Sequence, residues 1–264
     1  MLQAEGSTEL ETGIQPRQQS VPLNPNPVPA RGPRRRFFRK IGLLGAAVLA
    51  GCRFRAPVDS DHQVQTPAPI TDEPVCVLTP RATEGPFHFD TKLVRRDIIE
   101  DRAGIPLHMA VRVVAVDSNC EPLQGAFVDL WHADAAGAYS GYPGQPGGLD
   151  TSGQTFLRGI QITDVDGIVR FDTIYPGWYP GRAVHIHFKV HYENNSYLTS
   201  QFYFPDEISD RVFKRPPYSD RPNRAIRNAD DSVLRIDSAE GNLLASITED
   251  SAGHFGEFTV GLAL

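Results

Sequence analysis

The sequence has little cysteine, no excess of basic residues and no apolar run long enough to cross a membrane. Three cysteines occur in 264 residues, and 26 Lys and Arg stand against 32 Asp and Glu, which gives a formal net charge of −6. A nucleic-acid partner is excluded, because an acidic chain lacks the surplus of cations that neutralises phosphates. The apolar run from Ile41 to Ala50 has ten residues, whereas a membrane-spanning helix needs about 20.

Apolar residues and turn formers are plentiful. Hydrophobic residues make up 40% of the chain, with 14 Phe, which is enough to build a core. The 23 Gly and 22 Pro favour a turn-rich β protein over a helical bundle. The charges are split, since residues 1–51 hold seven basic and three acidic residues, and the remaining 213 hold 19 and 29. We interpret this split in charge as the boundary between an N-terminal targeting segment and the folded, functional domain.

The N-terminal targeting segment has the features of an export signal. A basic stretch, Arg34 to Lys40, precedes the short apolar run, as in signal peptides. The paired arginines before Phe37-Phe38 resemble a twin-arginine signal, and Leu49 to Cys52 resembles a lipobox whose cysteine would carry a lipid. We therefore predict export to the periplasm or the cell exterior, with membrane attachment through Cys52. The alternative is a short membrane-associated N-terminus that is never cleaved.

Three segments follow from this interpretation. Residues 1–51 are predicted to be a disordered leader with the export signal, residues 52–75 a Pro/Thr-rich linker, and residues 76–264 one domain. With Cys52 set aside, Cys76 and Cys120 form an even pair in a chain that meets an oxidising compartment. Their disulfide would close a loop of about 45 residues, worth about 3–4 kcal/mol in the chain-entropy model. The alternative is two unpaired buried thiols.

Short β-rich runs alternate with turn residues through the domain, and no long stretch shows a helical period. The turn Asp164 to Gly167 predicts a hairpin between the runs on either side of it. The pattern predicts an all-β fold, an antiparallel sandwich or barrel. The predicted strands are 108–116, 126–132, 156–163, 168–174, 183–192 and 200–204, with later candidates at 232–236, 243–247 and 257–262.

Two histidines and two tyrosines are candidate metal ligands. His185 and His187 lie two apart in a predicted strand, so both face one side with Cα atoms about 6.6 Å apart. Tyr139 follows a turn after a strand, and Tyr179 lies in the Gly/Pro loop before the histidine strand. Phenols ligate poorly unless a strongly charged cation removes the proton, so this set suits a hard trivalent ion such as Fe(III). The alternative is that both are ordinary turn tyrosines.

These residues carry a resemblance to a known family. The run from Trp131 to Tyr139, Tyr179-Pro180, Arg182 and His185-Ile186-His187 together resemble the intradiol ring-cleavage dioxygenases, which include protocatechuate 3,4-dioxygenase and catechol 1,2-dioxygenase. Thr83 to Phe87 resembles their common entry segment. The resemblance covers about half the chain, residues 76–204, and is greatest to the exported, single-chain branch.

The resemblance implies a β-sandwich with long loops around one mononuclear, non-haem Fe(III) held by Tyr139, Tyr179, His185 and His187. It also implies cleavage of a catechol-type ring by O2 between its two hydroxylated carbons, giving a muconate-type diacid. Tyr179 would take a substrate proton, Arg182 would stabilise developing negative charge, and Gln201 would line the pocket. The alternative role for Arg182 is a loop salt bridge.

Four points stay open at the level of sequence. One alternative is a non-catalytic β-sandwich binding or cell-surface module that has kept the scaffold, and another is a different metal at the same ligands. The identity of the catechol is not determined. Neither is the oligomeric state, for which a homo-oligomer is one alternative.

Overall fold

The computed structural model describes residues 76–264, apart from residue 194 and residues 238–242. The predicted leader (1–51) and linker (52–75), with Cys52, lie outside the described residues. Within the described part of the chain, no helix combines the length and the apolar character needed to cross a bilayer. Cys76 and Cys120 form a disulfide with their Cα atoms 5.6 Å apart, which confirms the predicted pair.

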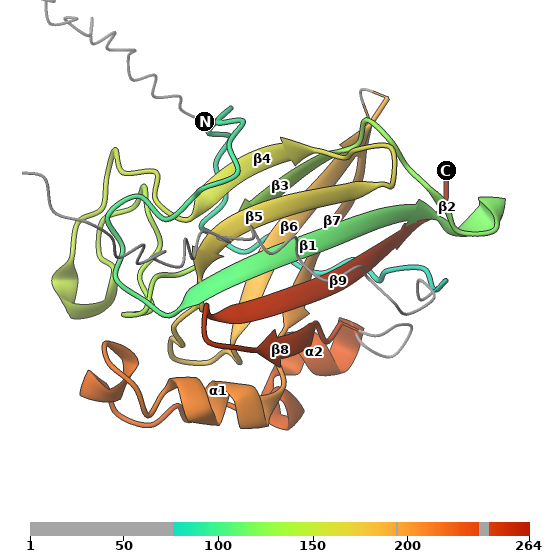
Figure 1. The fold of residues 1–264 in the computed structure, drawn as a ribbon. Helices are drawn as coiled ribbons and strands as arrows, with labels where there is room; N and C mark the ends of the chain where they lie inside the picture. The colour runs from blue at the N-terminus through green and yellow to red at the C-terminus, as the bar shows by residue number, and fades with distance from the viewer. Residues whose placement is uncertain (1–75, 194, 238–242) are drawn as a thin grey trace, which may run out of the picture. The chain divides into compact units, whose positions relative to one another are not determined.

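Two β-sheets pack face to face (Figure 1). The first sheet contains β1 (Pro106–Ala115), β2 (Glu121–Pro122), β5 (Ile168–Ile174), β8 (Ser246–Glu249) and β9 (His254–Leu262). The second contains β4 (Arg158–Ile162), β3 (Phe127–Trp131), β6 (His185–Tyr192) and β7 (Asn195–Tyr203), in that order. Two short helices, α1 (Asp206–Val212) and α2 (Ser232–Asp237), lie outside the sheets (Figure 1). Single 3-10 turns occupy Val116–Ser118, Pro146–Gly148, Tyr218–Asp220 and Asn228–Asp230.

The predicted all-β sandwich is confirmed, and its core lies between the two sheets. Alternate residues of each strand point into this core, as the period of two requires. On β6 the core-facing residues are Ile186, Phe188 and Val190, all fully buried. The other face of the same strand therefore carries His185 and His187. One pair departs from the antiparallel prediction, because β1 and β9 run parallel.

The predicted hairpin around Asp164 to Gly167 is wrong, although the turn itself forms. Asp164 Oδ1 accepts hydrogen bonds from the backbone N–H of Asp166 and of Ile168, and Gly167 adopts a φ of 71°. However, β4 pairs with β3 and β5 pairs with β1, so the turn carries the chain from one sheet to the other. Gly167 holds this connection between the two sheets against β1, because its carbonyl accepts a hydrogen bond from the Val113 N–H at 2.8 Å. A turn pattern does not reveal which sheet each strand joins.

The candidate strand at 232–236 is also wrong, because those residues begin α2. Asp231 explains the difference, since its carboxylate accepts hydrogen bonds from the backbone N–H groups of Val233 and Leu234 and so caps the helix. The candidate at 243–247 is displaced, and the strand β8 begins only at Ser246. Helix α1 occupies a charged segment for which no element was predicted.

Candidate metal centre

The outer face of β6 brings the two candidate histidines together. Both side chains are buried, and the Nε2 atoms of His185 and His187 are 3.0 Å apart. Trp131 lies opposite His187 in the β3–β6 register, and its indole stacks on that imidazole with the ring centroids 5.0 Å apart. The prediction that both imidazoles face one side of the strand is confirmed.

The two tyrosines reach the same place from separate loops. The Tyr179 hydroxyl is 3.0 Å from His185 Nε2. The ring centroid of Tyr139 is 5.7 Å from that of Tyr179 and 6.1 Å from that of His187. Gly137 lets the two loops meet, because a Cβ at this position would lie 2.3 Å from the Trp178 carbonyl oxygen, and its φ is 80°. All four predicted ligands therefore belong to one cluster.

A hydrogen bond orients the His185 imidazole, and a hydrogen bond and ring stacking hold Tyr139 in place. His185 Nδ1 donates to the Ala183 carbonyl at 2.7 Å, which leaves its Nε2 lone pair facing the cluster. The backbone N–H of Tyr139 donates to the Gln145 side-chain oxygen at 2.8 Å. The ring of Phe87 stacks on that of Tyr139 with centroids 4.7 Å apart. The directions of the ligand atoms are therefore set by the protein.

The entry segment predicted at Thr83 to Phe87 covers this cluster. A Cβ added at Gly85 would lie 3.4 Å from His187 Cε1, so the backbone passes directly over the imidazole. An ion pair between Glu84 and Lys189 holds the segment to the sheet, and the adjoining His88 hydrogen-bonds Asp129 at 2.8 Å. Water is thus kept from one side of the histidines.

Burial controls the protonation of the cluster. It lowers the pKa of His185 to about 3 and, together with the neighbouring His185, lowers the pKa of His187 well below its usual value. Both imidazoles are therefore neutral and able to donate a lone pair. Burial also raises the pKa of the Tyr139 hydroxyl, with a further contribution from Tyr179, and it raises the pKa of Tyr179 against the opposing charge of Arg182.

The donor atoms fit the ferric ion that the resemblance implies. Among the described residues, the buried Tyr139 hydroxyl has no hydrogen-bond partner. The His185 lone pair faces the other imidazole and the Tyr179 hydroxyl at the same 3.0 Å separation. In the part of the chain that the structure describes, no group of three or more His, Cys, Asp or Glu side chains is placed to hold a metal. A metal at this cluster therefore depends on the phenols, which suit a hard, trivalent cation.

Arg182 and Gln201 meet beside the cluster. One terminal nitrogen of Arg182, Nη2, donates to the side-chain oxygen of Gln201 and, at 2.7 Å, to the hydroxyl of Tyr203. The Nε atom donates to Asp231 at 2.9 Å, so the salt bridge considered as the alternative is also formed. The guanidinium also hydrogen-bonds the Tyr179 phenol and opposes the rise that burial causes in the pKa of that group, and the Arg182 side chain is 15% exposed.

The amide of Gln201 is fully engaged within the protein. Its oxygen accepts from Arg182 and Tyr203, and its nitrogen donates to the Thr83 carbonyl at 2.7 Å. Gln201 therefore links the entry segment to Arg182. Its role as a residue that lines the substrate pocket stays a prediction.

Sequence reasoning missed two residues that support the cluster. Asp231 could have been found from its position before the apolar run of α2, because Asp is a preferred residue at helix starts. Arg158 gives no such signal, although its buried guanidinium donates to the side-chain and backbone oxygens of Ser140, each at 2.8 Å. Burial lowers the pKa of Arg158 to about 10. His132 is packed away from the cluster, with hydrogen bonds to Ala133 and Thr173.

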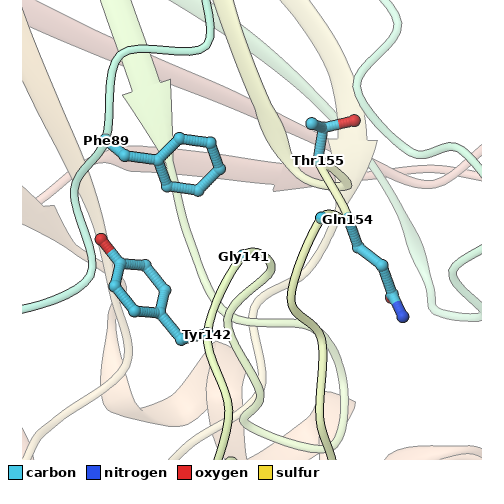
Figure 2. Close-up of a pocket in the computed structure, with 6 residues that line it drawn as sticks. Phe89, Gly141, Tyr142, Gln154 and Thr155 are labelled. Atoms are coloured by element: carbon cyan, nitrogen blue, oxygen red, sulfur yellow. The ribbon is translucent and has the colours of Figure 1, made fainter. Parts of the chain in front are cut away.

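A separate pocket of about 210 Å³ lies between the segment at Phe89 and the loops at 141–142 and 153–155 (Figure 2). Figure 2 shows the rings of Phe89 and Tyr142 on the same side of the backbone at Gly141, while the side chain of Gln154 points away. None of the predicted ligands lines this pocket, whose lining residues are Phe89, Gly141, Tyr142, Gly153, Gln154 and Thr155.

Several known proteins are similar to this chain in sequence and in fold. A family model described as Dioxygenase matches residues 79–216. The chain is 31% identical to catechol 1,2-dioxygenase 1 of Acinetobacter lwoffii over 63% of this chain and 58% of that protein. It is 34% identical to the protocatechuate 3,4-dioxygenase beta chain of Burkholderia cepacia over 40% of this chain and 49% of that one. The matches thus span about half the length of these two curated relatives.

A solved structure extends the likeness to the fold. The intradiol ring-cleavage dioxygenase from Tetranychus urticae aligns with a TM-score of 0.66 and 30% identity, covering 71% of this chain and 95% of that one. The dioxygenase domain of a carbohydrate-binding fusion protein from Streptomyces sp. SirexAA-E aligns with a TM-score of 0.53 and 31% identity, over 71% of this chain and 99% of that domain. The chain belongs to the intradiol ring-cleavage dioxygenase family.

Proposed function

We propose that this protein is a non-haem Fe(III)-dependent intradiol dioxygenase. It cleaves the ring of a catechol-type substrate with O2, between the two hydroxylated carbons, to give a muconate-type diacid. The observation that carries the proposal is the convergence of a buried phenol, a partly buried phenol and two buried, neutral imidazoles on one face of the second sheet. The names of the relatives support the reaction class.

Tyr139, Tyr179, His185 and His187 would hold the iron. When bound, ferric iron supplies a Lewis acid that draws electron density from a catecholate and so makes the ring reactive toward O2. Two phenolates offset part of the triple charge, so the site needs no carboxylate. The rings of Phe87 and Trp131 pack against Tyr139 and His187 and restrict the movement of those two side chains.

Tyr179 is the proton acceptor in this proposal. It is less buried than Tyr139, and its oxygen lies next to Arg182, whose charge favours the phenolate. A catechol must lose two protons to bind as a dianion, and one of them can pass to the Tyr179 oxygen. Tyr139 is fully buried and cannot exchange a proton with solvent as readily.

Arg182 orients the substrate and stabilises negative charge on it. Its guanidinium is held at Nε by Asp231 and at Nη2 by Gln201 and Tyr203, and it lies beside the Tyr179 phenol. A cation held in a fixed position stabilises developing charge without having to reorganise during the reaction. Arg182 would therefore stabilise negative charge on a catecholate bound at the cluster.

The test is oxygen uptake with a panel of catechols, comparing the wild type with Tyr179→Phe and His185→Ala. We expect uptake by the wild type with formation of a diacid, and a loss of uptake of about 100-fold or more in both variants. Equal uptake by all three proteins would refute the site. No uptake by iron-loaded wild type with any catechol would favour the non-catalytic binding module instead.

We also propose that the protein acts outside the cytoplasm. The disulfide between Cys76 and Cys120 supports this, because disulfides persist mainly in oxidising compartments. Replacing Arg35 and Arg36 with lysine should retain the protein in the cytoplasmic fraction, as measured by cell fractionation. A variant that is exported as well as the wild type would contradict the twin-arginine route. A mature protein that lacks lipid on Cys52 would contradict the membrane anchor.

A further inference from the structure

Asp231 is a fully buried carboxylate that lies beside the candidate centre, in contact with Arg182. It is 0% exposed, and it lies beyond residues 79–216, which the family model matches. A buried carboxylate is costly unless hydrogen bonds and an opposite charge compensate for the loss of water. Asp231 has both, because four N–H groups donate to its two oxygens.

The two oxygens of Asp231 serve different parts of the molecule. Oδ1 accepts from the backbone N–H groups of Val233 and Leu234, both at 2.9 Å, and so caps α2. Oδ2 accepts from Arg182 Nε at 2.9 Å and from the Ala183 backbone N–H at 2.7 Å. The side chain of Leu234 is buried in the main core, which anchors the helix.

The Oδ2 contacts lead directly to the candidate centre. The Ala183 carbonyl accepts the hydrogen bond from His185 Nδ1, and the Ala183 N–H donates to Asp231, so Asp231 holds the residue whose carbonyl sets the direction of this imidazole. The contact at Arg182 Nε leaves Nη2 for Gln201 and Tyr203, so the guanidinium is held beside the Tyr179 phenol. A guanidinium held at two of its three nitrogens cannot rotate without breaking both contacts.

We propose that Asp231 is a positioning residue that fixes the Arg182 guanidinium and the start of the histidine strand for ring cleavage. The inference rests on the proposed function of the site. It assigns the orientation of Arg182 to the residue that caps α2, which lies outside the motifs that carry the family resemblance. The cap and the positioning contact use different oxygens, so the two roles can be separated by mutation.

The decisive variant is Asp231→Ser. Serine is a good helix-capping residue, so the cap on α2 is kept, while its single, shorter hydroxyl cannot also reach Arg182 and Ala183. Asp231→Asn is the second variant, because it keeps the size and removes the charge. Asp210→Asn is the matched control, since Asp210 pairs with Arg224 and Arg227 away from the centre. Arg182→Ala, alone and with Asp231→Ser, completes a double-mutant cycle.

The measurements are kcat and KM by oxygen uptake, the thermal midpoint, and hydrogen exchange at the Arg182 Nε–H by NMR. We expect Asp231→Ser to lower kcat/KM by about 10- to 100-fold with a near-normal thermal midpoint. The Nε–H, assigned by its absence in Arg182→Ala, should exchange rapidly in both Asp231 variants and slowly in the control. In the Arg182→Ala background, Asp231→Ser should cause no further loss, because the two residues act as a unit.

Three results would overturn the proposal. The first is a wild-type kcat/KM in Asp231→Ser. The second is a loss of kcat/KM on Asp231→Ser that is equally large in the wild-type and the Arg182→Ala backgrounds. The third is an Arg182 Nε–H that stays protected from exchange in both Asp231→Ser and Asp231→Asn. A fall in activity matched by a fall in the thermal midpoint would show that Asp231 is only structural. If the iron-loaded wild type cleaves no catechol, the proposed function fails, while the exchange measurement still decides whether Asp231 holds Arg182.

Discussion

The two faces of β6 are built from adjacent residues and have opposite chemistry. Ile186, Phe188 and Val190 enter the apolar core between the sheets. His185 and His187 occupy the outer face, where loops from distant parts of the chain cover them. One strand thus contributes to stability through one face and supplies a candidate reaction centre on the other. Substitutions at neighbouring positions should therefore separate stability from activity.

The largest effect is expected on the outer face, from His187→Ala. Removal of one predicted ligand leaves an incomplete donor set, so we expect iron content and catechol cleavage to fall by about 100-fold or more. The free energy of unfolding should change less than in a core variant. Iron analysis and urea unfolding measure the two quantities on one preparation. A His187→Ala protein with normal iron content would break the comparison.

The next effect is expected one residue along, on the inner face. Phe188 is fully buried among core residues, so Phe188→Ala should reduce the free energy of unfolding by about 3–5 kcal/mol. Urea unfolding gives the value. Below the transition, the folded fraction should still bind iron and cleave catechol at a rate close to wild type. Loss of iron from the folded Phe188→Ala protein would show that the two faces are not independent.

The smallest effect is expected on the outer face of the first sheet, where polar residues meet solvent. Asp172 on β5 pairs with His108 and Arg96. Although burial raises the pKa of Asp172, hydrogen bonds from these two partners hold it below its usual value. This partly exposed network should contribute at most about 1 kcal/mol.

The direction of the Asp172 effect with pH follows from its lowered pKa. The stabilisation is present above the unfolded pKa of about 3.9 and is lost as the pH falls through the folded value. Asp172→Asn should therefore unfold with slightly less dependence on pH below about 4, as measured by thermal melts across that range. Catechol cleavage at neutral pH should be unchanged. A large loss of activity would place this surface in the reaction and contradict the comparison.

The sequence predicted most of this architecture, because alternation with a period of two identifies strands and their faces. The spacing of His185 and His187 was sufficient to place both imidazoles together. Tyr139 and Tyr179 depended on resemblance, since nothing local distinguishes a ligand from an ordinary turn tyrosine. The pairing of strands across Asp164 to Gly167 was not predictable, because a turn has the same residues whether it joins neighbours or crosses between sheets.

The supporting residues were the least predictable part of the site. Asp231 is 48 residues away from Ala183 in the sequence, and only tertiary packing makes them neighbours. Val233 and Leu234 resemble a strand when considered alone, and their helix follows from the cap and from burial of Leu234. Local propensity was overridden there by contacts that a linear pattern does not contain.

The central claim is that two phenolates and two imidazoles of this chain bind one ferric ion. The most direct measurement is the iron content and visible absorption of the purified protein after iron supplementation. The account predicts one iron per chain and a red, tyrosinate-derived absorption band that is lost in His187→Ala and changes when a catechol is added without oxygen. A colourless wild-type protein without iron would contradict the account.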